Sequence, residues 1–237
     1  RAIAAEKAGI LKPSVNGLPV IISQQDEDAR EVIMARATEY NLPLMCYGHD
    51  WRAYTEHGRL VIQHPDGLMD LPMPGLVGAH QIVNAATAVM AAYHLDIAEH
   101  AICEGLKKPV WPARLQKLTT GKLMDMATGE IWLDGGHNQA AAEALAVWLS
   151  DYFSNADKPV TLICGLMATK HAEKWLKSFS QSRVVLNCIT IPDQPNSYTA
   201  NDMTAKAQAA GLKAEAFNDL ETAISTAQGD VLICGSL

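Results

Sequence analysis

The chain has 237 residues, enough for one large or two ordinary domains, and its composition, 49% hydrophobic and 19% charged, is typical of a globular protein with a buried core. The net charge of -7 excludes a broad nucleic-acid-binding surface, and no apolar run approaches membrane-spanning length. The five cysteines form no CxxC pair, which argues against a zinc knuckle or a redox pair. Together with the lack of a secretory signal, this predicts a protein of the reducing cytoplasm.

The first part of the chain mixes short strands, helices and a meander. Apolar residues at helical spacing predict a helix over residues 26–40, with Asp26 as its cap. Short buried strands are predicted on either side, at residues 19–23 and 44–47. Three extended pieces separated by turns then predict an antiparallel meander. They are residues 51–55, 59–63 and 68–71, and predicted helices follow at 78–94 and 97–106.

The run Pro109-Val110-Trp111-Pro112 breaks this pattern and predicts a boundary between two domains, residues 1–110 and 111–237. Beyond a predicted hairpin of residues 115–118 and 122–126, strands alternate with helices. This alternation predicts an α/β fold with a doubly wound parallel sheet. The predicted strands are 131–134, 160–164, 184–190 and 231–234, and the predicted helices are 139–152, 170–179, 200–210 and 220–227.

The pentapeptide Asp134-Gly135-Gly136-His137-Asn138 stands where a predicted strand runs into a predicted helix. In open α/β sheets, ligands bind beyond the carboxyl ends of the strands. The carboxylate can accept a hydrogen bond from a ribose, the glycines let a ligand approach the backbone, and the imidazole can meet a base or a phosphate. The alternative is a tight turn in which Asp134 caps the helix. The local pattern leaves both interpretations open.

Four separated motifs occur in a characteristic order. They are Ile3-Ala4-Ala5-Glu6-Lys7-Ala8-Gly9-Ile10, Gly78-Ala79-His80-Gln81-Ile82-Val83-Asn84-Ala85-Ala86, Trp111-Pro112-Ala113-Arg114 and Asp134-Gly135-Gly136-His137-Asn138. This set resembles the folylpolyglutamate synthase/dihydrofolate synthase family, a branch of the Mur ligase superfamily. The resemblance spans most of the chain.

The resemblance implies a P-loop domain that holds ATP and magnesium, and a Rossmann-like carboxy-terminal domain that closes over it. Residues 1–110 would then be the carboxy-terminal part of the central, ATP-binding domain, including the small meander, and residues 111–237 the Rossmann-like domain. The implied reaction activates a pteroate- or folate-linked carboxylate as an acyl phosphate, which the amino group of L-glutamate converts into an amide.

The phosphate-binding loop of such an enzyme is missing from the sequence. No GxxxxGK[ST] occurs, and the Gly121-Lys122 pair lacks the rest of that motif. The chain also begins at Arg1 inside a helix-like stretch and ends just past an apparently buried strand, whereas natural termini are usually polar. We therefore expect a fragment of a longer protein that is inactive as a ligase by itself.

The sharpest site expectation concerns Lys7. In the family, the lysine of this motif carries a carbamate that helps to hold a magnesium ion, so the resemblance implies a catalytic and metal-binding role for Lys7 in the full-length protein. A carbamate requires a neutral amine, which burial favours, and its oxygens suit magnesium. An ordinary solvated lysine is the alternative.

The resemblance further implies that Asn84, Arg114, Asp134 and His137 bind the ATP cofactor. Asn84 is a poor helix former inside an alanine-rich helix, which hints at a role, and Arg114 follows the proline break, where its charge could reach a phosphate. The family normally has Gly where this chain has Ala113, and Ala where it has Gly136. Lys170 is followed by His171 rather than the family's Asp, which puts a family-type role there in doubt.

Two alternatives to a folate ligase remain. One is a Mur ligase that builds peptidoglycan precursors, and the other is a non-catalytic nucleotide-binding module. For the folate ligase the expected partners are L-glutamate and pteroate or folate substrates, with no nucleic acid and no membrane, and the protein is expected to be a monomer.

Overall fold

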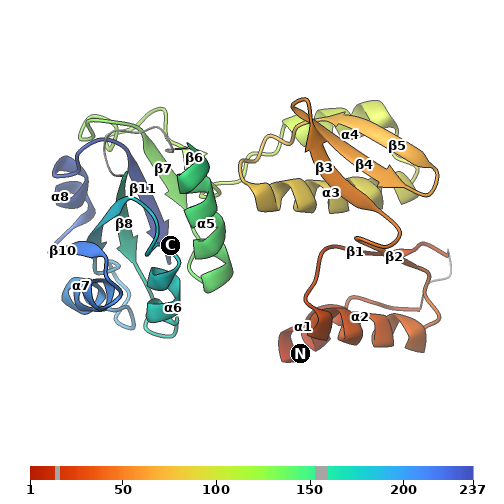
Figure 1. The fold of residues 1–237 in the computed structure, drawn as a ribbon, viewed down its shortest axis with the longest axis horizontal. Helices are drawn as coiled ribbons and strands as arrows, with labels where there is room; N and C mark the ends of the chain where they lie inside the picture. Colours follow the sequence, from red (N-terminus) through yellow and green to blue (C-terminus); the bar gives the residue numbers. More distant parts are fainter. Residues whose placement is uncertain (14–16, 153–159, 237) are drawn as a thin grey trace. The chain divides into compact units, whose positions relative to one another are not determined.

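The structure is a computed structural model that describes residues 1–13, 17–152 and 160–236 (Figure 1). The chain divides into two compact units. The first comprises Arg1–Gly75 and Ala79–Val110, and the second comprises Leu76–Gly78 and Trp111–Leu237. The change from one unit to the other falls inside the proline-containing run 109–112, and each unit has a hydrophobic core of its own.

The first unit begins with a pair of helices and a pair of strands. Helix α1 (Ala2–Ala8) packs against α2 (Glu27–Glu39), and β1 (Val20–Ile22) pairs in parallel with β2 (Leu44–Cys46). The strands and the helix predicted here are confirmed with slightly shorter bounds. Asp26 occupies the cap position of α2, but its side chain makes no capping hydrogen bond.

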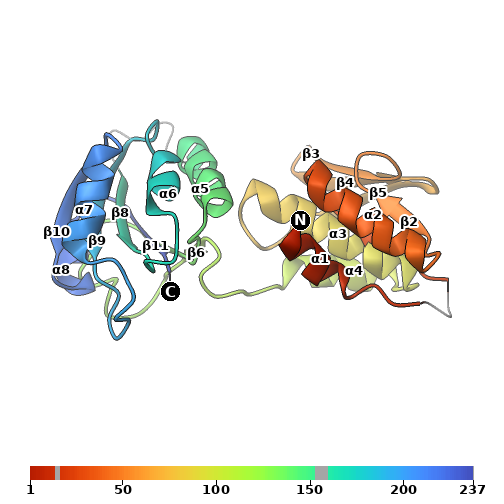
Figure 2. The same ribbon diagram turned by 90° about the horizontal axis from the view of Figure 1, so that it is seen from below.

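The predicted meander is confirmed as a three-stranded antiparallel sheet (Figure 2). Its strands are β3 (Arg52–Glu56), β4 (Arg59–His64) and β5 (Gly67–Pro72). The helices α3 (Ala79–His94) and α4 (Glu99–Lys107) pack against it and share its core, because their apolar residues recur at helical spacing on one face. The largest fully buried side chains of this core are Trp51, Leu60, Ile62, Leu71 and Met90.

The second unit is a six-stranded sheet in the order β10-β9-β8-β11-β7-β6. All neighbouring pairs are parallel except β6 with β7. The strands are β6 (Gln116–Lys117), β7 (Ile131–Asp134), β8 (Val160–Gly165), β9 (Val184–Ile189), β10 (Lys213–Phe217) and β11 (Val231–Gly235). The helices are α5 (Gln139–Tyr152), α6 (Ala172–Lys177), α7 (Ala200–Ala209) and α8 (Leu220–Ser225).

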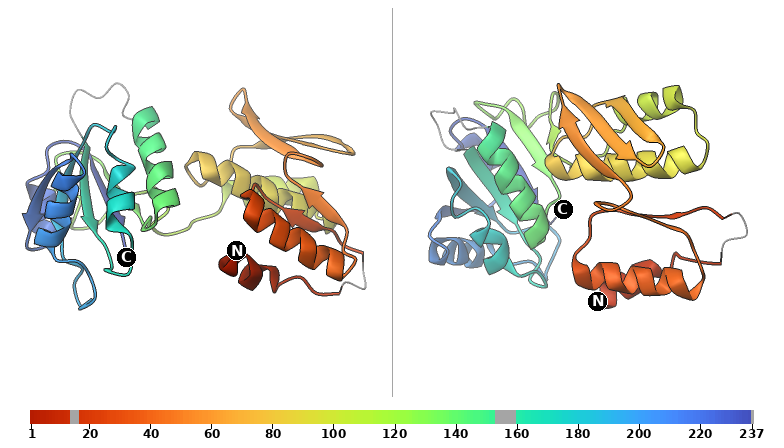
Figure 3. Two further views of the ribbon diagram at one scale, coloured as in Figure 1. Left: turned by 60° about the horizontal axis from the view of Figure 1, so that its bottom comes forward. Right: turned by 45° about the vertical axis from the view of Figure 1, so that its right-hand side comes forward.

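Helices cover both faces of this sheet (Figure 3). Side chains of α5, α6 and α7 form one core with Leu162 and Leu186, and side chains of α8 form a second core with Ile163 on the opposite face. Successive residues of β8 thus point into different cores, as the period of two in a strand requires. This is the expected α/β, Rossmann-like layering. Among the described helices, none combines the length and apolarity needed to cross a bilayer.

The position of β11 sets the geometry of the carboxyl edge. This last strand of the chain lies between β7 and β8, so that Cys234 pairs with Asp134 on one side and Gly235 with Gly165 on the other. The carboxyl ends of three strands from distant parts of the sequence therefore meet. Such a crossover point in an open α/β sheet is where ligands usually bind.

Two sequence predictions about the second unit were wrong. Residues 122–126 form turns rather than the second arm of a hairpin, and β6 pairs instead with β7, Gln116 opposite Leu133. Leu123 and Met124, whose apolar character suggested a strand, pack against the core beneath α8. Strand β10 was missed, because its alternation of charged and small residues gives a weak apolar signal.

Candidate functional site

Asp134 stands at the end of β7 and is 6% exposed. Its Oδ2 accepts the backbone N–H of Leu115 at 2.8 Å, and its Oδ1 accepts that of Gly136 at 2.8 Å, both in buried surroundings. Charge-assisted bonds of this kind are stronger than neutral ones. The carboxylate thus fastens two chain segments to the end of the strand.

The cap of α5 comes from another residue. Asn138 Oδ1 accepts the N–H of Ala141 at 2.9 Å, which satisfies one of the donors that a helix N-terminus leaves unpaired. The alternative interpretation, in which Asp134 caps this helix, is therefore wrong.

The loop that carries Arg114 is tied to the same turn. Ala113 O accepts the N–H of Gly135 at 2.9 Å, and the N–H of Ala113 donates to Gln116 Oε1 at 3.0 Å. Ala113 and Leu115 have φ angles of 55° and 45°, in the left-handed region that costs non-glycine residues energy. Arg114 is exposed, and within the described residues it makes no ion pair, so its guanidinium is available to a ligand.

His137 is held by its own turn. Its Nδ1 lies 2.9 Å from Gly135 O, and because a carbonyl oxygen only accepts, Nδ1 carries the proton. In the neutral ring, Nε2 is then the nitrogen with the lone pair. The ring is partly buried, so a ligand at the strand ends would meet an imidazole of defined tautomer.

Gly136 lies in a space that admits no side chain. A Cβ there would lie 2.8 Å from Asp134 Oδ1 and 3.1 Å from the Cβ of Ala141. Its carbonyl accepts the indole N–H of Trp175 on α6 at 2.9 Å. Sequence reasoning missed Trp175, because nothing in the local pattern of α6 connects it to a turn 39 residues earlier.

The neighbouring strand ends complete this edge. Gly235 has a φ of 121°, and a side chain there would collide with the carbonyl of Gly165. Ser236 donates its N–H to Gly165 O at 2.9 Å, and its Oγ accepts the N–H of Met167 at 3.2 Å. Burial, and secondarily the negative charge of Asp134, raises the pKa of the Cys234 thiol, so this cysteine stays protonated.

Lys7 lies on α1, where Ala8 alone is buried. Its side chain is 74% exposed and its Nζ lies 3.0 Å from Oε1 of Glu6. The burial expected for a carbamate-forming lysine is therefore absent from this structure. Within the described residues, no group of three or more histidine, cysteine or acidic side chains is placed to hold a metal ion. The residues present do not by themselves fit a magnesium site.

Asn84 lies on the exposed side of α3, and its Nδ2 donates to Oε1 of Gln81 one turn earlier at 3.2 Å. Asn84 also lines an open groove of about 710 Å³ between α3 and the segment that follows the Lys7 motif. The groove is lined by Ile10, Leu11, Lys12, Pro13, Leu18, Pro19, Val20, Ile21, Leu42, Asn84, Thr87, Ala88 and Ala91.

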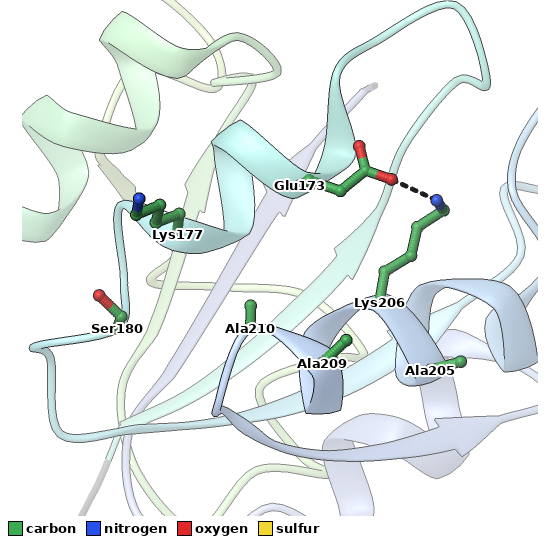
Figure 4. A pocket seen from close by; sticks show the side chains of 7 residues that line it. All are labelled: Glu173, Lys177, Ser180, Ala205, Lys206, Ala209 and Ala210. Atoms are coloured by element: carbon green, nitrogen blue, oxygen red, sulfur yellow. Dashed lines mark hydrogen bonds and ion pairs between the residues drawn. The ribbon is translucent and has the colours of Figure 1, made fainter.

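Three of the five predicted residues, Arg114, Asp134 and His137, therefore lie on segments of the second unit that hydrogen bonds join, although no bond of the Arg114 side chain itself is among them. Lys7 and Asn84 belong to the first unit. A further hollow of about 670 Å³ lies between α6 and α7 (Figure 4). Alanines of α7 line it and an ion pair joins Glu173 to Lys206 across it. Lys206 is thereby neutralised, which makes this hollow less suited to a polyanion than the strand ends are.

Comparison with known proteins places this geometry in a family. Residues 119–237 match the family described as Mur ligase, glutamate ligase domain. The chain is 28% identical over 208 residues to folylpolyglutamate synthase of Lacticaseibacillus casei, covering 83% of this chain and 45% of that protein. It is 25% identical over 250 aligned residues to dihydrofolate synthase/folylpolyglutamate synthase of Bacillus subtilis, covering 99% of this chain and 55% of that protein.

A solved structure is similar over almost the whole chain. It is the bifunctional folylpolyglutamate synthase/dihydrofolate synthase of Yersinia pestis complexed with AMPPNP and a Mn ion. The TM-score is 0.79 at 23% sequence identity, and the match covers 99% of this chain and 53% of that one. At this identity the likeness establishes the fold.

The sheet and its crossover edge are the fold of the matched domain, and the match covers half of the chain. The chain belongs to the Mur ligase family through its glutamate ligase domain. Within that family it belongs to the folylpolyglutamate synthase/dihydrofolate synthase branch. The chain spans about half the length of the curated relatives it matches.

Proposed function

We propose that the intact protein is an ATP-dependent ligase that adds L-glutamate to dihydropteroate, to reduced folates, or to both. ATP would phosphorylate the acceptor carboxylate and release ADP. The glutamate nitrogen would then attack the acyl carbon, so that a C–N bond forms, phosphate leaves and the nitrogen loses a proton. The observation that carries the proposal is the hydrogen-bonded turn of Asp134 and His137, with the Arg114 loop tied to it through Ala113 and Leu115, at the crossover edge of a sheet that matches the Mur ligase family.

In this proposal the residues of the second unit bind the nucleotide. Arg114 would meet a phosphate with charge-assisted hydrogen bonds, because its guanidinium has no acidic partner in the described chain. His137 would offer its imidazole to the base or a phosphate. Asp134, at the carboxyl end of β7, would accept a ribose hydroxyl.

In the first unit, Asn84 would contact the nucleotide, and a carbamate on Lys7 would form only in the intact protein. Because Lys7 is exposed here, the carbamate needs its own test. Carbon-13 NMR of the intact protein in labelled bicarbonate should show a carbamate signal that the Lys7→Ala variant lacks. The matched control is Lys12→Ala, which removes another exposed lysine five residues later. An unchanged signal in Lys7→Ala would make Lys7 an ordinary surface residue.

The function is tested by phosphate release from the intact enzyme. Release should require ATP, L-glutamate and a pteroate or folate acceptor together. Release driven by a muramyl-peptide acceptor, with none from pteroates, would assign the protein to peptidoglycan synthesis. ATP binding without turnover on either acceptor would favour the non-catalytic nucleotide-binding module.

The 237 residues by themselves should show no turnover. Catalysis of phosphoryl transfer depends on positioning and charge stabilisation by a phosphate-binding loop, and the sequence contains no such motif. The same assay on the purified 237-residue chain checks this. Glutamate-dependent phosphate release by that chain alone would require a phosphate site within these residues.

A further inference from the structure

Trp175 is the buried side chain that joins helix α6 to the Asp134–Asn138 turn. It is 1% exposed, and its ring packs edge-to-face on Phe179 with centroids 4.8 Å apart. Its Nε1 donates to Gly136 O at 2.9 Å in buried surroundings. A buried polar atom requires such a partner, so the bond selects one orientation of the Gly136 carbonyl.

That orientation controls the residue that follows. The Gly136 carbonyl belongs to the same planar peptide group as the N–H of His137, and the chain contains no cis peptide bond in its described residues. In a trans peptide, C=O and N–H point in opposite directions. A carbonyl directed at Trp175 therefore turns the N–H of His137 away from α6. Together with the contact between His137 Nδ1 and Gly135 O, this peptide plane sets how the His137 side chain sits in the turn.

Gly136 has little other freedom. Its N–H is bound to Asp134 Oδ1 at 2.8 Å, and the space beside its Cα is bounded by Ala141 and Leu145 of α5. Trp175 thus holds one end of the residue while Asp134 holds the other. Without the indole N–H, the carbonyl would be buried and unpaired, which favours rotation of the peptide group.

We propose that Trp175 is a positioning residue of the nucleotide site. Its indole N–H sets the Gly136–His137 peptide plane and thereby aims the His137 imidazole at the bound nucleotide. This inference rests on the proposed function, in which His137 contacts ATP. Trp175 itself, buried beneath the turn, touches no substrate.

The test is Trp175→Phe in the intact enzyme, which keeps an aromatic ring and removes the N–H. The KM for ATP should rise about tenfold, the effect of losing roughly 1.4 kcal/mol, while the KM for glutamate stays unchanged. The matched control is Phe179→Leu, which disturbs the same buried aromatic pair but removes no hydrogen bond. An equal rise in the KM for ATP in both variants would reduce Trp175 to core packing and overturn the proposal.

A second measurement separates this proposal from the proposed function. In NMR spectra of the protein, Trp175→Phe should shift the imidazole resonances of His137, and Phe179→Leu should leave them near their original values. If wild type shows no ATP-dependent turnover, the proposed function fails, and unchanged His137 resonances would in addition overturn the positioning role. If Trp175→Phe does not fold, a benzothiophene analogue of tryptophan at position 175 removes only the N–H and serves as the variant.

Discussion

Asp134 at the end of β7 binds the backbone N–H of Leu115, 19 residues earlier, at 2.8 Å. Through this bond the acid of the strand-to-helix turn fixes the loop that carries Arg114. The second carboxylate oxygen binds the N–H of Gly136. A side chain expected either to bind a ribose or to cap the helix is therefore the structural link between two parts of the candidate site.

The first prediction is that Asp134→Asn lowers the stability of the second unit. The amide has one acceptor oxygen, so either Leu115 or Gly136 keeps a buried N–H facing an NH₂ group. We expect a loss of about 1–3 kcal/mol in the free energy of unfolding. Urea unfolding followed by tryptophan fluorescence measures this, because Trp132, Trp148 and Trp175 lie in this unit.

The control for Asp134 is Asp125→Asn, an exposed aspartate of the same unit. It should change the free energy of unfolding by less than about 0.5 kcal/mol. Equal stabilities of Asp134→Asn and Asp125→Asn would contradict the proposed link. Because Asp134→Asn is expected to lower stability, any loss of ATP affinity in this variant must be separated from its loss of stability.

The second prediction is that Ala113→Gly stabilises the protein. The φ of 55° at Ala113 is strained for alanine and free for glycine. After the entropy that glycine gains in the unfolded chain is subtracted, the free energy of unfolding should rise by roughly 0.5–1 kcal/mol. Urea unfolding measures it.

The control for Ala113 is Ala205→Gly, an exposed alanine inside α7. Glycine in a helix interior costs about 1 kcal/mol relative to alanine, so the two variants should shift stability in opposite directions. Destabilisation by both would show that the backbone at Ala113 is not strained in solution.

The sequence predicted most of the fold, because buried strands such as β8 and β11 are continuous apolar runs between helical patterns. It failed at β10, an edge strand with alternating charge, and at residues 122–126, whose apolar side chains cover a sheet face from a turn. Both failures arise from tertiary packing that local spacing does not encode.

The candidate site was predicted less completely. The pentapeptide itself was located, since a strand end followed by a helix N-terminus has a local signature. The bonds that organise it join residues 19 and 39 positions apart, Asp134 to Leu115 and Gly136 to Trp175. These bonds depend on strand order and on left-handed backbone at Ala113 and Leu115. No local pattern in the sequence predicts either feature.

The third prediction is that Gly136→Ala destabilises the second unit. The new methyl group would lie 2.8 Å from Asp134 Oδ1 and 3.2 Å from Cδ1 of Leu145. Relief requires movement of the carboxylate that holds Leu115. We expect a loss of roughly 1–3 kcal/mol, measured by native-state hydrogen exchange of β7 and β11.

The matched control for Gly136 is Gly105→Ala in α4, where a Cβ meets nothing within 4 Å. Alanine should stabilise that helix by up to about 1 kcal/mol, measured by exchange in the first unit. If Gly136→Ala were equally harmless, the turn would have room that the structure does not show.

The last prediction concerns pH. The backbone N–H of Cys46 donates to Asp50 Oδ2 at 2.7 Å, and His49 lies 2.8 Å from Oδ1. The Cys46 N–H, aided by His49 and opposed by partial burial, holds the pKa of Asp50 below its usual value. A lowered folded-state pKa means that Asp50 stabilises the first unit above the unfolded pKa of about 3.9, and that this stability is lost as the pH falls through the folded-state pKa.

Between pH 6 and pH 3, amide exchange in β3 and β4 should therefore show wild type losing more stability than Asp50→Asn. The Asp26→Asn variant, whose aspartate makes no side-chain capping bond, should follow wild type. Identical pH dependence in Asp50→Asn and wild type would mean that the Cys46 bond does not favour the ionised carboxylate.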